Sequence, residues 1–282
     1  MTKQNDPTKR HDAIVLFDCT NSNPNGDPDA LNAPRMDITT QHGLVTDAAI
    51  KRKIRNYVLD KKQGEEGYKI FVTQGAILND AIKAGYDALT IKVSKAGNPE
   101  QQAQVQAWMQ QQYWDIRMFG AVLSTGMNAG QVWGPVQVGF GSSVDPIEPM
   151  TVTLTRCAAT DGKEGKDNKT MGTKEIIPYG LYRAEISYNP NRASDAVTSA
   201  DLELFWEALL NCWENSDSSS KRLDCQGLMV FTHESKLGDI PRRDINSAVS
   251  VIKKEDQNVP RCFSDYEVAI DSDLADRFAR FR

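Results

Sequence analysis

The chain has 282 residues, of which 40% are hydrophobic and 25% charged, and it carries a formal net charge of −5 with a pI of about 5.4. This hydrophobic content supports a packed core and excludes wholesale disorder, while the absence of a long apolar run argues against a membrane-spanning helix. The five cysteines are scattered and the chain starts with polar residues, which favours a cytoplasmic protein. The three histidines do not stand at metal-ligand spacing, so we expect no metal, and we expect no cofactor.

The first predicted element is a buried strand over residues 12–19, because β-branched and aromatic residues follow one another there between polar turn formers. Residues 20–45, here called the Asn/Pro loop, are rich in Asn, Pro, Gly and Asp. A loop of this length without regular structure is usually functional. Thr46 is predicted to cap a helix that ends near Lys62, with Asp47 in its first turn.

One face of this predicted helix is apolar, and the rest of its surface is basic. The apolar positions at helical spacing are Ile50, Ile54, Tyr57 and Val58. The basic positions, here called the basic stripe, are Lys51, Arg52, Lys53, Arg55, Lys61 and Lys62. Residues 46–62 have a net charge of +4, so the remainder of the chain carries −9. Because few acidic residues stand at i+4 spacing, the stripe is predicted to be open to a polyanion, with a solvated helix face as the alternative.

The remaining elements complete a mixed pattern. A strand at 68–72 and helices near 76–88 and over 99–119 predict a helical insertion, and a second amphipathic helix begins at Thr198. Strands are predicted at 135–140, 150–157, 175–188, 228–232 and 262–270. Residues 158–174 are almost free of apolar side chains and predict an exposed hairpin arm. Without the insertions, the order strand, helix, strand, strand, helix, strand is the ferredoxin-like pattern of RNA-recognition modules, an α+β fold.

Catalytic motifs are weak in this sequence. The Asn/Pro loop holds Asp27, Asp29 and Asp37, but it lacks the downstream glutamate of a calcium loop and is interrupted by prolines, so turn formation is favoured. The glycine-rich residues 120–141 lack the GK[ST] of a phosphate-binding loop. Ser124 and Ser143 lie outside any G-x-S-x-G context. Two hypotheses therefore remain: a structural RNA-binding protein, and a metal-dependent endoribonuclease that uses the loop aspartates.

Three blocks resemble a known family. The first block is CTNSNPNGDPDALNAPRMD with the following GLVTDAAIKRKIRNYV, the second is FGAVLSTGMNAGQVWGPVQVGFGSS, and the third is IIPYGLYRAEISYNP. They are similar to the backbone subunits of Cascade, the surveillance complex of type I CRISPR systems, and most of all to those of subtype I-C. Together the blocks cover most of residues 12–190. The resemblance implies one modified RNA-recognition domain over 1–282 (the palm), with helical fingers inserted near 64–119 and a protruding hairpin thumb near 157–175.

The same resemblance implies a role in antiviral defence. Several copies would assemble head to tail along one CRISPR RNA and present it to a target DNA strand, with other Cascade subunits at the ends and no membrane. The implied RNA-binding residues are Asn21, Asn23, Arg35, Lys51, Arg52, Arg55, Gln131, Gln137, Lys169, Met171 and Lys174. Type III relatives cut RNA with an aspartate in the corresponding loop. Here Asn32 or Ala33 stands at that position, which implies a subunit that is not an enzyme.

Overall fold

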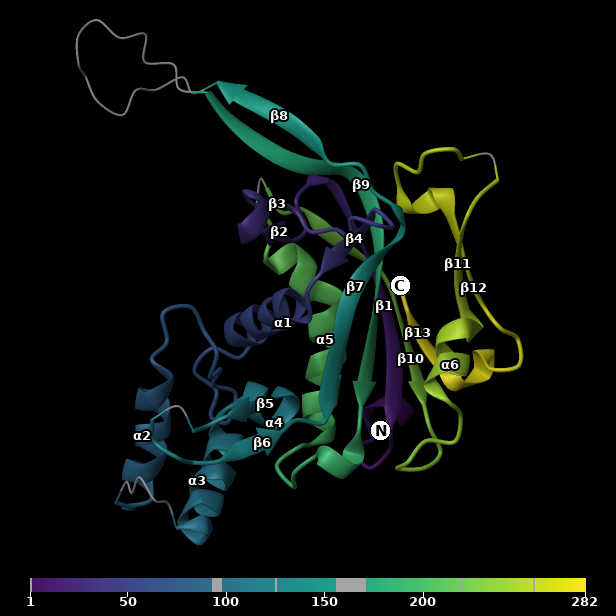
Figure 1. The fold of residues 1–282 in the computed structure, drawn as a ribbon. Helices are drawn as coiled ribbons and strands as arrows, with labels where there is room; N and C mark the ends of the chain where they lie inside the picture. The colour runs from purple at the N-terminus through teal and green to yellow at the C-terminus, as the bar shows by residue number, and fades with distance from the viewer. Residues whose placement is uncertain (1, 93–97, 125, 156–170, 219, 256) are drawn as a thin grey trace, which may run out of the picture.

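The computed structural model describes residues 2–92, 98–124, 126–155, 171–218, 220–255 and 257–282 (Figure 1). Its centre is an antiparallel sheet of seven strands in the order β13-β10-β1-β9-β7-β4, with β8 paired to β9 off this path. These strands are β1 (His11–Ser22), β4 (His42–Val45), β7 (Val136–Pro146), β8 (Met150–Thr155), β9 (Met171–Tyr188), β10 (Leu223–Thr232) and β13 (Phe278–Phe281).

Strand β1 lies in the interior of the sheet, as its continuous apolar sequence predicts. His11 stands opposite Tyr188 of β9 on one side and Thr232 of β10 on the other. Both faces of the strand are buried: Val15 and Phe17 belong to one core cluster, whereas Ile14 and Leu16 belong to another. A strand with two covered faces needs apolar residues at every position, so the usual alternation is absent.

Two helices cover one face of the sheet. Helix α1 (Asp47–Lys61) is capped by Thr46, whose side chain accepts a hydrogen bond from the amide of Ala49 at 3.2 Å. Helix α5 (Ser199–Asn215) starts with a capping box between Thr198 and Asp201. Both caps confirm the predicted helix starts. The elements β1, α1, β7, β9, α5 and β10 follow one another in the predicted order, and their strands lie in the spatial order β10-β1-β9-β7.

A third layer covers the opposite face. Helix α6 (Arg242–Ala248) leads into a two-stranded ribbon of β11 (Val249–Lys253) and β12 (Tyr266–Ile270), which packs on the Ile14 and Leu16 side of β1. The sequence predicts only the second of these two strands. The short 3-10 helices are η1 (Lys3–Asn5), η2 (Pro28–Ala30), η3 (Pro190–Arg192), η4 (Phe263–Asp265) and η5 (Ala275–Arg277).

The helical insertion has a hydrophobic core of its own, which extends from Phe71 to Val132. Its elements are α2 (Leu78–Ala88), α3 (Pro99–Gln112), α4 (Trp114–Phe119), β5 (Gly120–Val122) and β6 (Gln131–Trp133). The single predicted helix over 99–119 is wrong, because Tyr113 is extended and separates α3 from α4. The predicted strand at 68–72 is also wrong, since the residue there that pairs, Lys69, forms an isolated bridge to Tyr113.

The two predicted irregular segments contain more regular structure than expected. Within the Asn/Pro loop, β2 (Gly26–Asp27) and β3 (Ala33–Pro34) form a small hairpin, and β4 joins the main sheet. Residues 171–174 of the predicted arm belong to β9 and pair with β8, so the arm begins as a two-stranded ribbon. Residues 156–170 lie outside the described residues. None of the helices in the described part of the chain combines the length and apolar character needed to cross a bilayer.

Candidate nucleic-acid interface

The exposed side of α1 carries the predicted basic stripe, but its cations are more strongly paired than the sequence indicates. Lys51 Nζ lies 3.0 Å from Asp47 Oδ2, one turn earlier in the helix. Arg52 is exposed, and its guanidinium donates a hydrogen bond to Gln74 Oε1 at 2.9 Å. The premise that the stripe lacks acidic partners is therefore wrong for Lys51. Arg52, which bonds a neutral amide, is the more accessible of these two cations.

Arg55 is not exposed as the sequence predicts. Its side chain is only 13% exposed, and its Nε donates to Asp115 Oδ2 at 2.8 Å. Asp115 is 1% exposed and also accepts hydrogen bonds from the backbone amides of Phe71 and Val72, at 2.7 and 3.1 Å. Because the partner carboxylate comes from α4, 60 residues along the chain, sequence spacing along α1 cannot reveal it. Arg55 joins α1 to the helical insertion.

Lys53 is a second correction to the basic stripe. The sequence places it on the flank of α1, yet the residue is 8% exposed and belongs to the covered side of the helix. This burial lowers the pKa of Lys53 below its ordinary value, because a charged amine is poorly solvated away from water. Lys53 is therefore a poor candidate for a phosphate contact.

A small groove lies next to the stripe, and Phe119 connects the two. The ring centroid of Phe119 is 6.0 Å from Lys51 Nζ and 5.1 Å from Arg55 Cζ, distances at which a cation interacts with an aromatic face. Phe119 also lines the groove, a hollow of about 290 Å³ between the β5–β6 hairpin and the start of β7. The predicted residues Gln131 and Gln137 line the same hollow.

Glycines allow the walls of the groove to approach each other. A Cβ atom on Gly134 would stand 2.1 Å from the carbonyl carbon of Phe119, and one on Gly120 would stand 2.5 Å from the amide nitrogen of Gly134. Gly120 has φ +80°, a conformation that other residues rarely adopt. The glycine-rich block therefore serves close backbone packing. Gln137 Nε2 donates to the carbonyl of Gly134 at 3.2 Å, which holds its amide at the groove.

Two residues of the groove were missed by sequence reasoning. Trp133 is 63% exposed, and the guanidinium carbon of Arg192 lies 5.4 Å from its ring centroid. The period-2 alternation of an exposed Gln131, a buried Val132 and an exposed Trp133 is the signal that could have identified the tryptophan. Arg192 comes from η3 after β9, and no local pattern links it to β6.

The Asn/Pro loop forms a separate cluster at the start of α1. Asn21 is exposed and has φ 48°. Asn23 is buried, and its Nδ2 donates to the carbonyl of Asn32 at 2.7 Å, while Arg35 lies 3.4 Å from Asp27. Within the described residues, Asn23 Oδ1 and Arg35 Nε are buried without a hydrogen-bond partner. Buried polar atoms without a partner are costly, so each of these two atoms needs a specific explanation.

The thumb residues lie on the β8–β9 arm. Met171 is 72% exposed, and Lys174 is half-buried opposite Val152 of β8. Lys169 lies outside the described residues. In Figure 1 the arm, the β2–β3 hairpin, α1 and the β5–β6 hairpin follow one another down the same side of the sheet. The predicted residues thus do not form one compact site and are distributed along the molecule, an arrangement that suits a long ligand.

The loop carboxylates are engaged locally. Asp27 Oδ1 pairs with Arg35 and accepts a hydrogen bond from the amide of Asp29 at 3.2 Å. The backbone amide of Thr39 donates to Asp37 Oδ1 at 2.9 Å and holds the pKa of that carboxyl below its ordinary value. In the described ranges, no three His, Cys, Asp or Glu side chains come close enough together to hold a metal ion.

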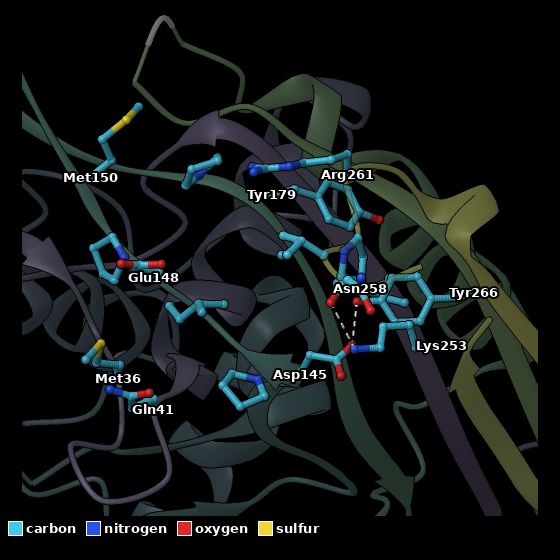
Figure 2. Close-up of a pocket in the computed structure, with 18 residues that line it drawn as sticks. Met36, Gln41, Asp145, Glu148, Met150, Tyr179, Lys253, Asn258, Arg261 and Tyr266 are labelled. Carbon is cyan, nitrogen blue, oxygen red and sulfur yellow. Dashed lines mark hydrogen bonds between the residues drawn. The ribbon is translucent and has the colours of Figure 1, made fainter. Parts of the chain in front are cut away.

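A larger hollow lies away from the stripe. It has a volume of about 770 Å³ and lies between the Asn/Pro loop, the β7–β8 turn and the loop between β11 and β12. Figure 2 shows the side chains that line it. Its lining includes two carboxylates, Asp145 and Glu148, and two cations, Lys253 and Arg261. Asp145 accepts a hydrogen bond from the hydroxyl of Tyr266 at 2.7 Å. With both signs of charge in its walls, this hollow lacks the one-sided potential that attracts a polyanion.

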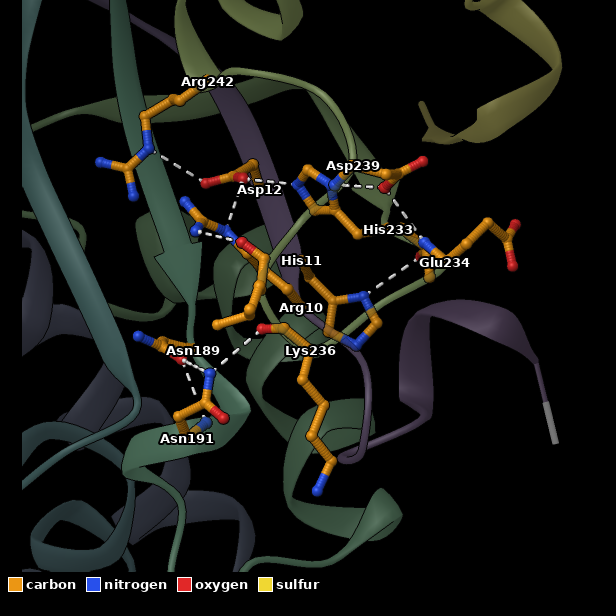
Figure 3. A network of polar contacts seen from close by, with 12 residues as sticks. Arg10, His11, Asp12, Asn189, Asn191, His233, Glu234, Lys236, Asp239 and Arg242 are labelled. Carbon is orange, nitrogen blue, oxygen red and sulfur yellow. Dashed lines mark hydrogen bonds and ion pairs between the residues drawn. The ribbon is translucent and has the colours of Figure 1, made fainter.

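A third polar cluster surrounds His233 at the start of β1 (Figure 3). The imidazole is fully buried between Asp12 Oδ2 at 2.8 Å and Asp239 Oδ1 at 2.9 Å. Although burial raises the pKa of Asp12, the bond to His233 and the charges of Arg10 and Arg242 hold it below the ordinary value. Because the histidine has no exposed surface, the cluster ties the segment after β10 to β1 and offers no access to a substrate.

An acidic α+β chain with a basic helix beside an amide-lined groove is a candidate polyanion-binding protein. Comparison with protein families is specific: residues 9–271 match the family of the CRISPR-associated protein Cas7. The chain belongs to this family. It is 26% identical over 267 residues to the CRISPR-associated protein Cas7 of Haloferax volcanii, covering 83% of this chain and 68% of that relative.

Three solved chains to which this chain is similar come from CRISPR complexes. A chain of a CRISPR RNA-guided surveillance complex in a pre-nicking state has a TM-score of 0.49 and 16% identity, with 78% of this chain and 75% of that chain covered. A second surveillance-complex chain has a TM-score of 0.47 at 16% identity, covering 78% and 68%. A chain of a type III-B Cmr-beta complex bound to cognate target RNA has a TM-score of 0.42 at 12% identity, covering 79% and 61%.

Proposed function

We propose that this Cas7-family chain is a non-catalytic backbone subunit of a type I-C Cascade. In this proposal several copies assemble head to tail along one CRISPR RNA and hold it for pairing with a target DNA strand, while other subunits cap the filament. The observation that carries the proposal is the position of the half-buried Lys51, whose Nζ lies 6.0 Å from the Phe119 ring, beside a groove that Phe119 lines together with Gln131 and Gln137. The accessible Arg52 follows Lys51 on the same helix. Phosphates bind to the cations, and amides bind to sugars or base edges.

The architecture supports the same proposed function. We take the sheet with α1 and α5 as a modified RNA-recognition palm, since the strand order β10-β1-β9-β7 is compatible with a ferredoxin-like topology. The insertion with its own core corresponds to the fingers, and the β8–β9 arm with its exposed Met171 corresponds to the thumb. An exposed, flexible methionine suits contact with the apolar face of a base.

The alternative function is a metal-dependent endoribonuclease of the type III kind. Two-metal hydrolysis needs convergent carboxylates, and the loop aspartates are instead engaged with Arg35 and backbone amides. Labelled RNA incubated with Mg²⁺ or Mn²⁺ separates the two functions. We expect no cleavage, whereas cleavage that disappears in Asp27→Ala or Asp29→Ala would establish the nuclease.

RNA binding itself is tested by titrating a single-stranded RNA at several salt concentrations. Each phosphate contact contributes about −0.7 to the slope of log K against log salt for single strands. We expect Lys51→Ala and Arg52→Ala each to weaken binding to every RNA sequence. Each variant should also make the negative slope less steep by about 0.7. The matched control is Arg243→Ala, an 87% exposed cation on α6 that pairs with Asp244. Affinity that does not depend on salt, or an equal effect of the control, would overturn the proposal.

A further inference from the structure

We infer that Trp133 and Arg192 form a stacking site for one nucleobase of the bound single strand. This inference rests on the proposed function and adds an aromatic stacking contact to the proposed interface. Aromatic side chains bind single strands without sequence preference because every base offers a π-face. The inference stands on the exposure of Trp133, on its geometry in the β5–β6 hairpin and on the charge of the groove.

Trp133 is exceptional among the five tryptophans of the chain. Its residue is 63% exposed, whereas Trp114 and Trp213 are fully buried, Trp206 is 3% exposed and Trp108 is half-buried. A large aromatic surface left in water is unfavourable unless a partner covers it in the working state. The tryptophans at the other positions are accounted for by core packing, and Trp133 is not.

The hairpin holds the ring in a defined place. Trp133 pairs with Gly120 of β5, so no side chain stands beside it at the facing position. Gln131 precedes it by two residues and therefore projects from the same face of the strand. The strand thus presents an aromatic ring for stacking and, one pleat away, an amide able to bond a base edge. The planar guanidinium of Arg192, 5.4 Å from the ring centroid, adds a positive charge that suits the adjoining phosphate.

The charge of the groove favours a nucleic acid over a protein segment. Among the described residues that line it there is no carboxylate, and its one charged residue is Arg192, in a chain with 38 acidic residues. The hollow in Figure 2 contains Asp145 and Glu148, and the hollow near Phe140 contains Glu185. The groove near Trp133 instead has Arg192 as the one charged residue in the described part of its lining, so that lining presents no carboxylate to repel a phosphodiester chain.

The test compares an oligouridylate with a strand of equal length whose residues are abasic, so that phosphates remain and bases are removed. We expect Trp133→Ala to weaken oligouridylate binding about tenfold and to leave binding of the abasic strand unchanged. Trp133→Phe, which keeps a ring, should restore most of the affinity. In the wild type, the oligouridylate should protect Trp133 from quenching by iodide. The control is Phe140→Ala, which removes a 56% exposed aromatic residue beside Glu185.

The outcomes separate this inference from the proposed function. If the wild type binds both strands and Trp133→Ala binds the oligouridylate with the same affinity as the wild type, the stacking site is refuted, whereas the proposed RNA binding is not. If Trp133→Ala weakens both strands equally, the tryptophan acts through structure, and the inference fails. If the variant changes the sedimentation of the RNA-free protein and not its affinity for RNA, the ring contacts protein. If the wild type ignores both strands at low salt, the proposed function fails as well.

Discussion

Replacing Arg55 by alanine separates a structural cation from an RNA-binding one on the same helix. The substitution removes the positive partner of Asp115, which is 1% exposed, and leaves that carboxylate with two backbone amide donors. Breaking a buried ion pair from one side costs about 3–5 kcal/mol. Because the two amides still solvate Asp115, we expect the lower end, about 3 kcal/mol, which corresponds to a fall in Tm of roughly 5 °C for a chain of 282 residues.

Equilibrium unfolding in urea, followed by circular dichroism, measures the change directly as a lower midpoint at unchanged slope. Arg55→Met keeps a side chain that can pack against Phe119 and removes only the charge. Because the loss comes from the missing charge, this variant should lose nearly as much stability as Arg55→Ala. The matched control Arg52→Ala should stay within about 0.5 kcal/mol of the wild type and affect RNA affinity instead. If Arg55→Ala is as stable as Arg52→Ala, then Asp115 does not depend on Arg55, and our account of the link between α1 and the insertion is wrong.

Two further predictions concern buried ionisable groups. Burial lowers the pKa of His11 to about 4, so between pH 6.5 and pH 4 the unfolded chain binds a proton that the folded chain does not, and the free energy of unfolding should fall by about 2–3 kcal/mol from pH 7 to pH 4.5. His11→Gln should flatten this dependence in urea titrations, and an unchanged pH profile would contradict the assignment. Lys53→Met should unfold at a higher urea concentration than the wild type, because it removes an amine whose pKa burial already lowers, and it should leave RNA affinity unchanged. A loss of RNA affinity in this variant would indicate that Lys53 contacts the RNA after all.

Local sequence rules predicted the parts of the fold that depend on local chemistry. The cap at Thr46, the capping box at Thr198 and the doubly buried strand β1 follow from side chains within a few residues of each element. The break between α3 and α4 could not be read in this way. Tyr113 is extended because Lys69, far back in the chain, exchanges backbone hydrogen bonds with Gln112 and Trp114.

The sequence predicted some of the exposed cations of the candidate site, but it did not predict which residues from other elements contact them. Helical spacing correctly placed Lys51 and Arg52 on the uncovered side of α1. Spacing along one helix carries no information on what other elements contribute, so it missed the pairing of Arg55 with Asp115 and the burial of Lys53. The contact of Arg192 with Trp133 joins η3 to β6 and was invisible for the same reason.

The central position of β1 has a consequence for synthesis of the chain. Residues 11–22 pair with β9 and with β10, whose last residue is Thr232, so β1 leaves the ribosome before either neighbour and does not have both of them until Thr232 has been made. At a translation rate of about 5–20 residues per second, this delay is roughly 10–40 s. During that time an apolar segment with two unpaired edges is exposed to aggregation, and long-range pairing of this kind folds slowly. A chaperone that binds this segment on the nascent chain should therefore raise the yield of folded protein.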